Sequence, residues 1–147
     1  MSMEENRRKH LEMIQNVIQR MANNSFLLKG WTVSLIVAVF VLADKTMNQI
    51  YFGFTYIPVI AFWFLDAYYL QLERKYTTLY DDARQKKKVD FDLSIKAVNY
   101  KSTKKEHLRY SKCLFSASEW LFYIPIALLL TIIFWNEITV VFNILKP

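Results

Sequence analysis

Three long apolar segments, separated by strongly charged ones, constrain most what this chain can fold into. They span residues 26–43, 50–72 and 113–136. At about 1.5 Å per residue, the shortest would cover about 27 Å as a helix, close to the thickness of a bilayer core. A helix also satisfies its backbone hydrogen bonds internally, as lipid requires. The sequence therefore predicts an all-α integral membrane protein with three transmembrane helices.

Composition agrees with this prediction. The 147 residues include only 2 Gly and 3 Pro, which disfavours a sheet-rich fold with many turns. The single cysteine, Cys113, excludes an internal disulfide framework. Residues 1–25 contain three glutamates and no small-residue cleavage site follows them, so we expect this segment to stay on the mature protein.

The distribution of lysine and arginine predicts the orientation. Residues 1–29 hold five of them and residues 73–112 hold twelve, which together are 17 of the 19 in the chain. Three spans place these two segments on the same side, and basic loops remain in the cytoplasm. We therefore expect a bacterial inner-membrane protein with a cytoplasmic amino terminus. The turn 44–49 and the carboxyl-terminal tail 137–147 would lie outside.

Two of the spans are predicted to continue into the cytoplasm as helices. Apolar residues spaced by three and four before and within the first span predict one helix from Glu4 to Ala43. A similar pattern leaves the second span and ends at Lys86, so the two extensions would pack side by side. Residues 1–25 and 73–112 are thus cytoplasmic helical segments. A third helix is expected to begin near Ser102 and run straight into the third span.

Asp66 is the only charged residue of the second span, and a carboxylate in lipid costs at least about 2 to 3 kcal/mol unless it is paired or hydrated. Counted from the outer turn, Lys29 and Asp66 differ in depth by about three residues, or about 4.5 Å. We therefore predict a Lys29–Asp66 pair that fixes the register of the helix hairpin. The alternative is a hydrated carboxylate that lines a pore or a proton path.

Further residues are candidates for a role at the membrane boundary. Two prolines, Pro58 and Pro125, are expected to kink their spans. A collar of polar residues is predicted at the inner boundary and comprises Asn23, Asn24, Ser25, Glu73, Arg74 and Glu119. Contacts with anionic lipid or with a partner are predicted for Lys86, Lys87, Lys88, Lys101, Lys104 and Lys105.

Motifs for catalysis are missing from the sequence. It contains no glycine-rich phosphate loop, no cluster of metal ligands and no arrangement of nucleophile and base. His10 and His107 have no companion cysteines and are interpreted as surface residues. These features favour a non-enzymatic protein that uses no cofactor and no metal. Nucleic acid is not an expected partner, because few aromatic residues accompany the basic ones.

Two strings of residues carry a resemblance to other proteins. One is HLEMIQ at 10–15 leading to NSFLLKGW at 24–31, and the other is FLDAYYL at 64–70 leading to the pair at 73–74. They resemble a group of short, uncharacterised bacterial three-span membrane proteins, some of which are associated with anti-phage defence loci. The resemblance covers about half the chain. It implies a membrane-perturbing effector controlled by a cytoplasmic partner or signal, and it implies no catalytic residues.

Three functions remain open at this point. The first is a self-associating protein that forms a pore or perturbs the membrane and is controlled from the cytoplasm, with lipids and further copies of itself as partners. The second is a membrane anchor or adaptor that recruits a soluble cytoplasmic protein through residues 73–112. The third is a small proton-coupled transporter that uses Asp66.

Overall fold

The computed structural model describes residues 3–42, 53–85, 91–95 and 103–135. Every regular element in these ranges is helical, which confirms the all-α prediction at that level. The elements in chain order are α1 (Met3–Leu42), α3 (Tyr56–Gln85), the 3-10 helix η2 (Thr103–Leu108), α4 (Tyr110–Leu114) and α5 (Ala117–Ile133).

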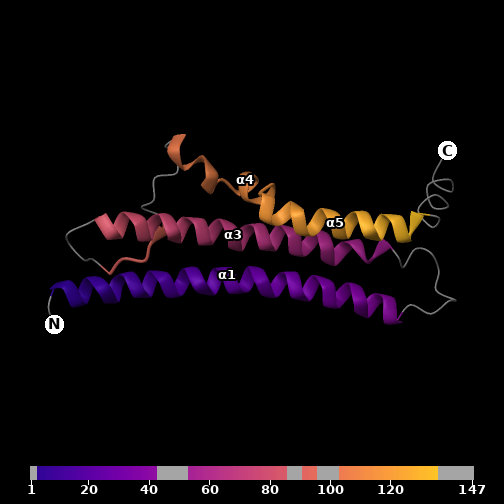
Figure 1. Cartoon of the computed structure of the whole chain (residues 1–147), viewed down its shortest axis with the longest axis horizontal. Helices are drawn as coiled ribbons and strands as arrows, with labels where there is room; N and C mark the ends of the chain where they lie inside the picture. The colour runs from indigo at the N-terminus through magenta and orange to yellow at the C-terminus, as the bar shows by residue number, and fades with distance from the viewer. Residues whose placement is uncertain (1–2, 43–52, 86–90, 96–102, 136–147) are drawn as a thin grey trace.

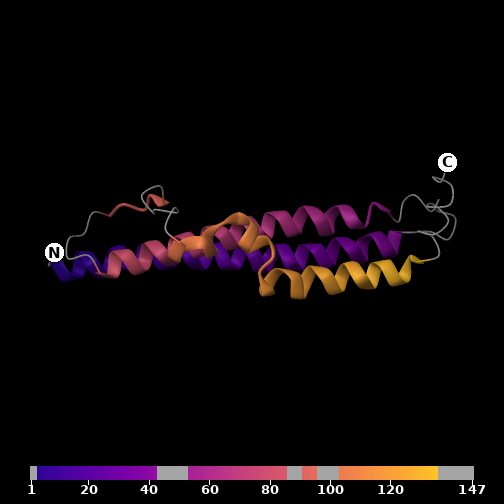
Figure 2. The ribbon, with the colours of Figure 1, turned by 90° about the horizontal axis from the view of Figure 1, so that it is seen from above.

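The molecule is an elongated bundle built on an antiparallel pair, α1 and α3 (Figure 1). Helix α5 runs parallel to α1 and packs beside one half of this pair only (Figures 1 and 2). We call that part, residues 26–42, 53–68 and 115–135, the three-helix half. Residues 3–25 and 69–85 form the two-helix half, against which η2 packs.

Helix α1 is a single uninterrupted helix of 40 residues, and at 1.5 Å per residue it is about 60 Å long. Its sequence contains no proline. Glu4 and Glu5 lie in the first turn, where their negative charges interact favourably with the positive end of the helix dipole. Helix α3 has 30 residues and ends at Gln85. Both helices therefore continue far beyond the apolar segments, as the spacing of their apolar residues predicts.

Each half has its own core. In the three-helix half Ile36 of α1 and Val59 of α3 pack with Tyr123, Leu130 and Phe134 from the third apolar segment. In the two-helix half the buried residues are Ile14 of α1, Leu79 of α3 and Leu108 of η2. The Arg7 side chain also donates to the Arg84 carbonyl over 2.6 Å, which joins the beginning of α1 to the end of α3.

The third helix is not continuous, so the prediction of a straight helix from Ser102 into the third span is wrong. Helix α4 ends at Leu114, Phe115 closes it, and Ser116 begins α5 with extended backbone angles of φ −74° and ψ 154°. Ser116 is followed three residues later by Glu119, a serine–glutamate spacing typical of a helix N-terminus. The Ser116 side chain makes no capping hydrogen bond, however, and the Glu119 carboxyl lies at Lys29 instead. Trp63 of α3 donates to the Leu114 carbonyl at the end of α4 and so stabilises the break from outside the segment.

The two prolines differ in their position. Pro58 is the third residue of α3, in the first turn, where its missing N–H removes no intrahelical hydrogen bond. It therefore marks the beginning of the helix instead of kinking its interior. Pro125 lies inside α5 and leaves the Leu121 carbonyl without its usual intrahelical donor.

Candidate functional site

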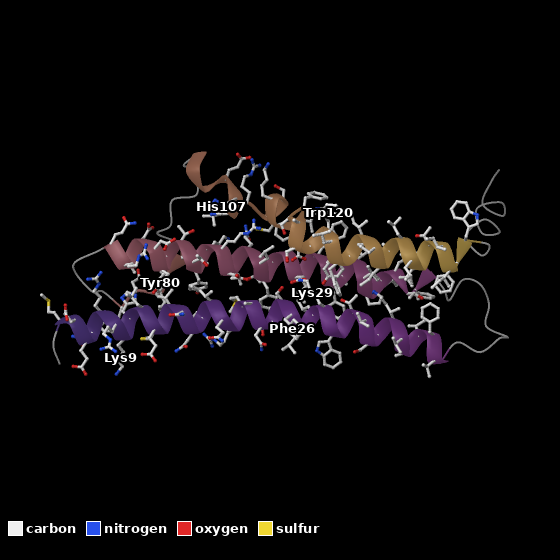
Figure 3. All side chains as sticks on the ribbon, in the orientation of Figure 1. Lys9, Phe26, Lys29, Tyr80, His107 and Trp120 are labelled. Carbon is white, nitrogen blue, oxygen red and sulfur yellow. The ribbon has the colours of Figure 1, made fainter. Side chains whose placement is uncertain are left out.

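Large apolar side chains are exposed on all three helices of the three-helix half. They begin at Phe26 on α1, extend to Tyr68 on α3, and begin at Phe115 before α5. On the described parts of α1 and α3 in the two-helix half, only Met3 and Met13 belong to this class. Phe26 points away from the bundle on one side and Trp120 on the other (Figure 3). We call this zone the apolar band.

By length and hydropathy, one described helix qualifies to cross a membrane. It is α1, for which the qualifying stretch ends at Val41 and contains a window with a mean hydropathy of 1.6. Helix α5 is strongly apolar but has 17 residues. Helix α3 is apolar near its beginning, but that part contains Asp66 and several tyrosines. A membrane location is therefore compatible with the structure, and one described helix meets the length and hydropathy of a span.

Lys29 brings charged residues of three helices together at one point. Its Nζ contacts Asp66 Oδ2 of α3 and lies 3.5 Å from Glu119 Oε1 of α5. It also donates to Ser25 Oγ, one turn earlier on α1, over 3.2 Å. The Lys29 side chain lies between α1 and α3 near the middle of the molecule (Figure 3). The structure therefore contains the predicted Lys29–Asp66 pair and adds Glu119 to it.

The carboxyl groups of this cluster are fully enclosed. Asp66 and Glu119 each have 0% exposure, and Tyr123 has 1%. Tyr123 donates its hydroxyl hydrogen to Asp66 Oδ2 over 3.1 Å. The rings of Phe122 and Tyr123 also lie 5.9 and 6.0 Å from Lys29 Nζ, within the range of a cation–π contact. We call Lys29, Asp66, Glu119 and Tyr123 the charge cluster.

The charge cluster lies near one edge of the apolar band. Phe26 is three residues from Lys29, Tyr68 is two from Asp66 and Phe115 is four from Glu119. On all three chain segments the edge is thus within about one helical turn, or about 6 Å, of the cluster. In the other direction α1 continues 13 residues past Lys29, so the band extends about 20 Å beyond the cluster.

The collar residues do not all share one role. Ser25 and Glu119 join the charge cluster directly. Asn23 is exposed and Asn24 is half-buried on α1. Glu73 is half-buried and lies seven residues, about two turns, beyond Asp66 on the two-helix side. Desolvation raises the pKa of its carboxyl above the ordinary value, although the nearby Arg74 and Lys29 cations act in the opposite direction.

Arg74 and other donors of α3 hold the broken third segment in place. Arg74 donates to the His107 carbonyl over 3.0 Å, and Gln71 donates to the Leu108 carbonyl over 2.9 Å at the end of η2. Trp63 Nε1 donates to the Leu114 carbonyl over 3.1 Å at the end of α4. These carbonyls lie at helix ends, where no helical donor follows. Arg74 and Gln71 therefore hold the end of η2, and Trp63 stabilises the break between α4 and α5 that places Glu119 beside Lys29.

Pro125 borders an apolar groove between α1 and α5 with a volume of about 270 Å³. Its lining is hydrophobic and includes Val33, Ile36, Ile126 and Leu129. Within the described chain no group of three or more histidine, cysteine, aspartate or glutamate side chains could hold a metal ion.

The remaining predicted contacts are basic residues. Lys86, Lys87, Lys88 and Lys101 lie outside the described residues, as do the turn 44–49 and the tail 137–147. Lys104 and Lys105 belong to η2. The exposed basic residues of the described segment that follows are Arg109 and Lys112, and Lys112 lies 3.7 Å from Glu106 in an exposed ion pair.

Sequence reasoning did not identify Tyr123 as a member of the site and did not connect Glu119 with Lys29. The spacing of Glu119 and Tyr123 by four residues places both on one face of α5, which is the signal that could have suggested a shared partner. No protein-family model, curated protein or solved structure matches this chain. The geometry of the charge cluster and the apolar band therefore carries the functional argument alone.

Proposed function

We propose that this chain is a bacterial inner-membrane protein in which α1, α3 and α5 all cross the bilayer, with the two-helix half in the cytoplasm. The apolar band supports this proposal. Exposed large apolar side chains on three helices would face water at high cost in a soluble protein, and they end at one level on all three. Basic residues concentrate beyond that level, as expected for the cytoplasmic side.

We further propose that the protein is a non-enzymatic, self-associating effector that forms a pore or perturbs the membrane under control from the cytoplasm. A role in anti-phage defence, which the sequence resemblance implies, is part of this proposal. The observation that carries this proposal is the closed charge cluster. Its members come from three different helices, so it exists only while the three are docked. A charged group within a span is expensive and is by default a candidate functional group.

The two-helix half offers a route for control. Helices α1 and α3 pass through the level of the cluster without interruption and remain packed together through Ile14 and Leu79. A partner or signal that separates these extensions would also separate Lys29 from Asp66. The opened charges would then need water or a second copy of the chain as neighbours, because lipid cannot solvate them. Separation of the two extensions in the cytoplasm would in this way make the membrane permeable.

Dye release from liposomes that contain the purified protein tests this proposal, together with single-channel recording. We expect release that increases when Lys29→Met opens the cluster, while Lys112→Met, in an exposed ion pair, should behave as the wild type. Absence of release and of conductance in the wild type and in Lys29→Met, in every oligomeric state, would contradict the proposal.

A second candidate function, a small proton-coupled transporter, is favoured by one observation. Asp66 Oδ1 and Glu119 Oε2 are buried and have no hydrogen-bond partner among the described residues. Buried carboxyl groups of this kind are typical of proton relays. In that case Asp66→Asn should abolish coupled transport and leave the fold intact. A loss of stability alone would support a structural role for the pair with Lys29.

A further inference from the structure

The charge cluster contains more acidic groups than basic ones. Asp66 and Glu119 contribute two carboxyl groups, and Lys29 contributes one ammonium. Both carboxyl groups have 0% exposure, so water does not solvate them. If all three groups were ionised, the cluster would carry one uncompensated negative charge inside the apolar band. A buried charge of that kind is strongly unfavourable.

The neighbouring groups do not supply the missing positive charge. From α1, Ser25 accepts from Lys29, and the Thr32 hydroxyl donates to the Leu28 carbonyl. From α5, Tyr123 contributes a neutral hydroxyl. From α3, Glu73 adds a further acid beyond the cluster, and Arg74 points its guanidinium at the His107 carbonyl and Cys113. Among the described residues, Lys29 is therefore the one cation that contacts these carboxyl groups.

The positions of the carboxyl oxygens identify what restores the balance. Lys29 Nζ contacts Oδ2 of Asp66 and Oε1 of Glu119, while the second oxygen of each group is buried without a partner. One ammonium thus serves two buried carboxyl groups, and each of them keeps one oxygen that can bear a proton. A carboxyl group that carries a proton is neutral and can donate a hydrogen bond, so a single proton at this point restores the charge balance.

We propose that the cluster is a proton-binding site and holds one proton, shared between Asp66 and Glu119, at neutral pH. With this proton the cluster is electrically neutral, which suits its place in the apolar band. Its loss would leave two carboxylates beside one lysine and would push α5 away from α1 and α3. This inference is independent of what the protein does to the membrane, because it concerns only how three buried groups are accommodated.

Infrared spectroscopy of the protein in lipid bilayers at neutral pH tests the proposal, because a protonated carboxyl has its own carbonyl stretching band. We expect the intensity of one protonated carboxyl per chain, and incorporation of isotope-labelled glutamate should shift part of it. The band should disappear in Glu119→Gln. It should also disappear in Asp66→Asn, where Lys29 and the remaining Glu119 balance one to one. Glu106→Gln, in an exposed ion pair outside the cluster, should keep it.

Two outcomes would overturn the proposal. A wild-type protein without the protonated-carboxyl band at neutral pH would show that the cluster holds no proton. A full band in folded Asp66→Asn would place the proton on Glu119 alone and contradict sharing. Helix content measured by circular dichroism identifies variants that fail to fold. Glu73→Gln removes the glutamate outside the cluster whose pKa desolvation raises, and it should keep the full band. The spectra of the wild type and of this variant, with and without labelled glutamate, decide the question even if both cluster variants unfold.

Discussion

At the scale of single residues, Lys29 determines how the three helices meet. It is the shared partner of Asp66 and Glu119, and its side chain is 19% exposed while theirs are fully buried. Half of this arrangement follows from the sequence, because counting residues from the outer turn places Lys29 and Asp66 at similar depth. The role of Glu119 does not follow, since the depth of the third segment depends on where its helix begins.

Removing Lys29 should therefore lower the stability of the folded protein. Lys29→Met leaves two carboxyl groups without their cation, and we expect the free energy of unfolding to fall by about 3 kcal/mol, a typical value for a broken buried pair. Denaturant titration in detergent micelles measures it. Lys112→Met, the matched exposed control, should change it by less than about 1 kcal/mol. Equal effects of the two substitutions would argue against a buried network.

Because of Glu73, we expect the free energy of unfolding to depend on pH. Desolvation raises the pKa of its carboxyl, against the effects of Arg74 and Lys29, so the folded state binds its proton more tightly than the unfolded state. The stabilisation from this group is therefore present at low pH and is lost as the pH rises from about 4 towards neutrality. Glu73→Gln stays neutral and should lose less stability over this range than the wild type.

Thermal unfolding in detergent at several pH values measures this difference. Glu12→Gln, on an exposed position of α1, is the matched control and should follow the wild-type curve. If Glu73→Gln loses stability between about pH 4 and neutral pH as steeply as the wild type does, Glu73 is not the group that causes the pH dependence. The effect should be small, because Glu73 is only partly buried and solvent screens its charge.

At the scale of elements, the break between α4 and α5 is the feature that the sequence analysis missed. Apolar spacing predicts long helices well, and α1 and α3 follow it, because helix period and burial point to the same residues. The Ser116–Glu119 spacing marks the break in the sequence, and Trp63 of α3 donates to the last carbonyl of α4 beside it. A donor on a distant helix, such as the Trp63 indole, could not be assigned from the sequence without knowing which helix faces the break.

Trp63 gives a direct test of how the break is held. Trp63→Phe removes the N–H that donates to the Leu114 carbonyl, and leaving that acceptor without its partner should cost about 1 to 2 kcal/mol. Amide hydrogen exchange across residues 110–116 should become faster than in the wild type. Trp120→Phe, whose side chain is 44% exposed, should leave exchange in this segment unchanged. Unchanged exchange in Trp63→Phe would show that the indole does not stabilise the break.

At the scale of the whole molecule, the apolar band and the charge cluster belong to the same three helices. The band gives three helices a common apolar exterior, and the cluster joins them inside it, near the edge that faces the basic segments. The two-helix half extends the same α1–α3 pair beyond that edge, on the side that we propose to be cytoplasmic. The sequence predicts this arrangement from its apolar segments and its charge distribution, while the contacts inside the cluster come from the structure.

Labelling of single cysteines in intact cells with a membrane-impermeant thiol reagent tests the three-span topology most directly. The native Cys113 is first replaced by alanine, and one cysteine is then introduced at Gln19, Asn48, Lys112 or Asn143. Three spans predict labelling from outside at Asn48 and Asn143, and labelling at Gln19 and Lys112 only after the cells are broken. Labelling of Lys112 and Asn143 from the same side would contradict the account, because the third helix would then not cross the membrane.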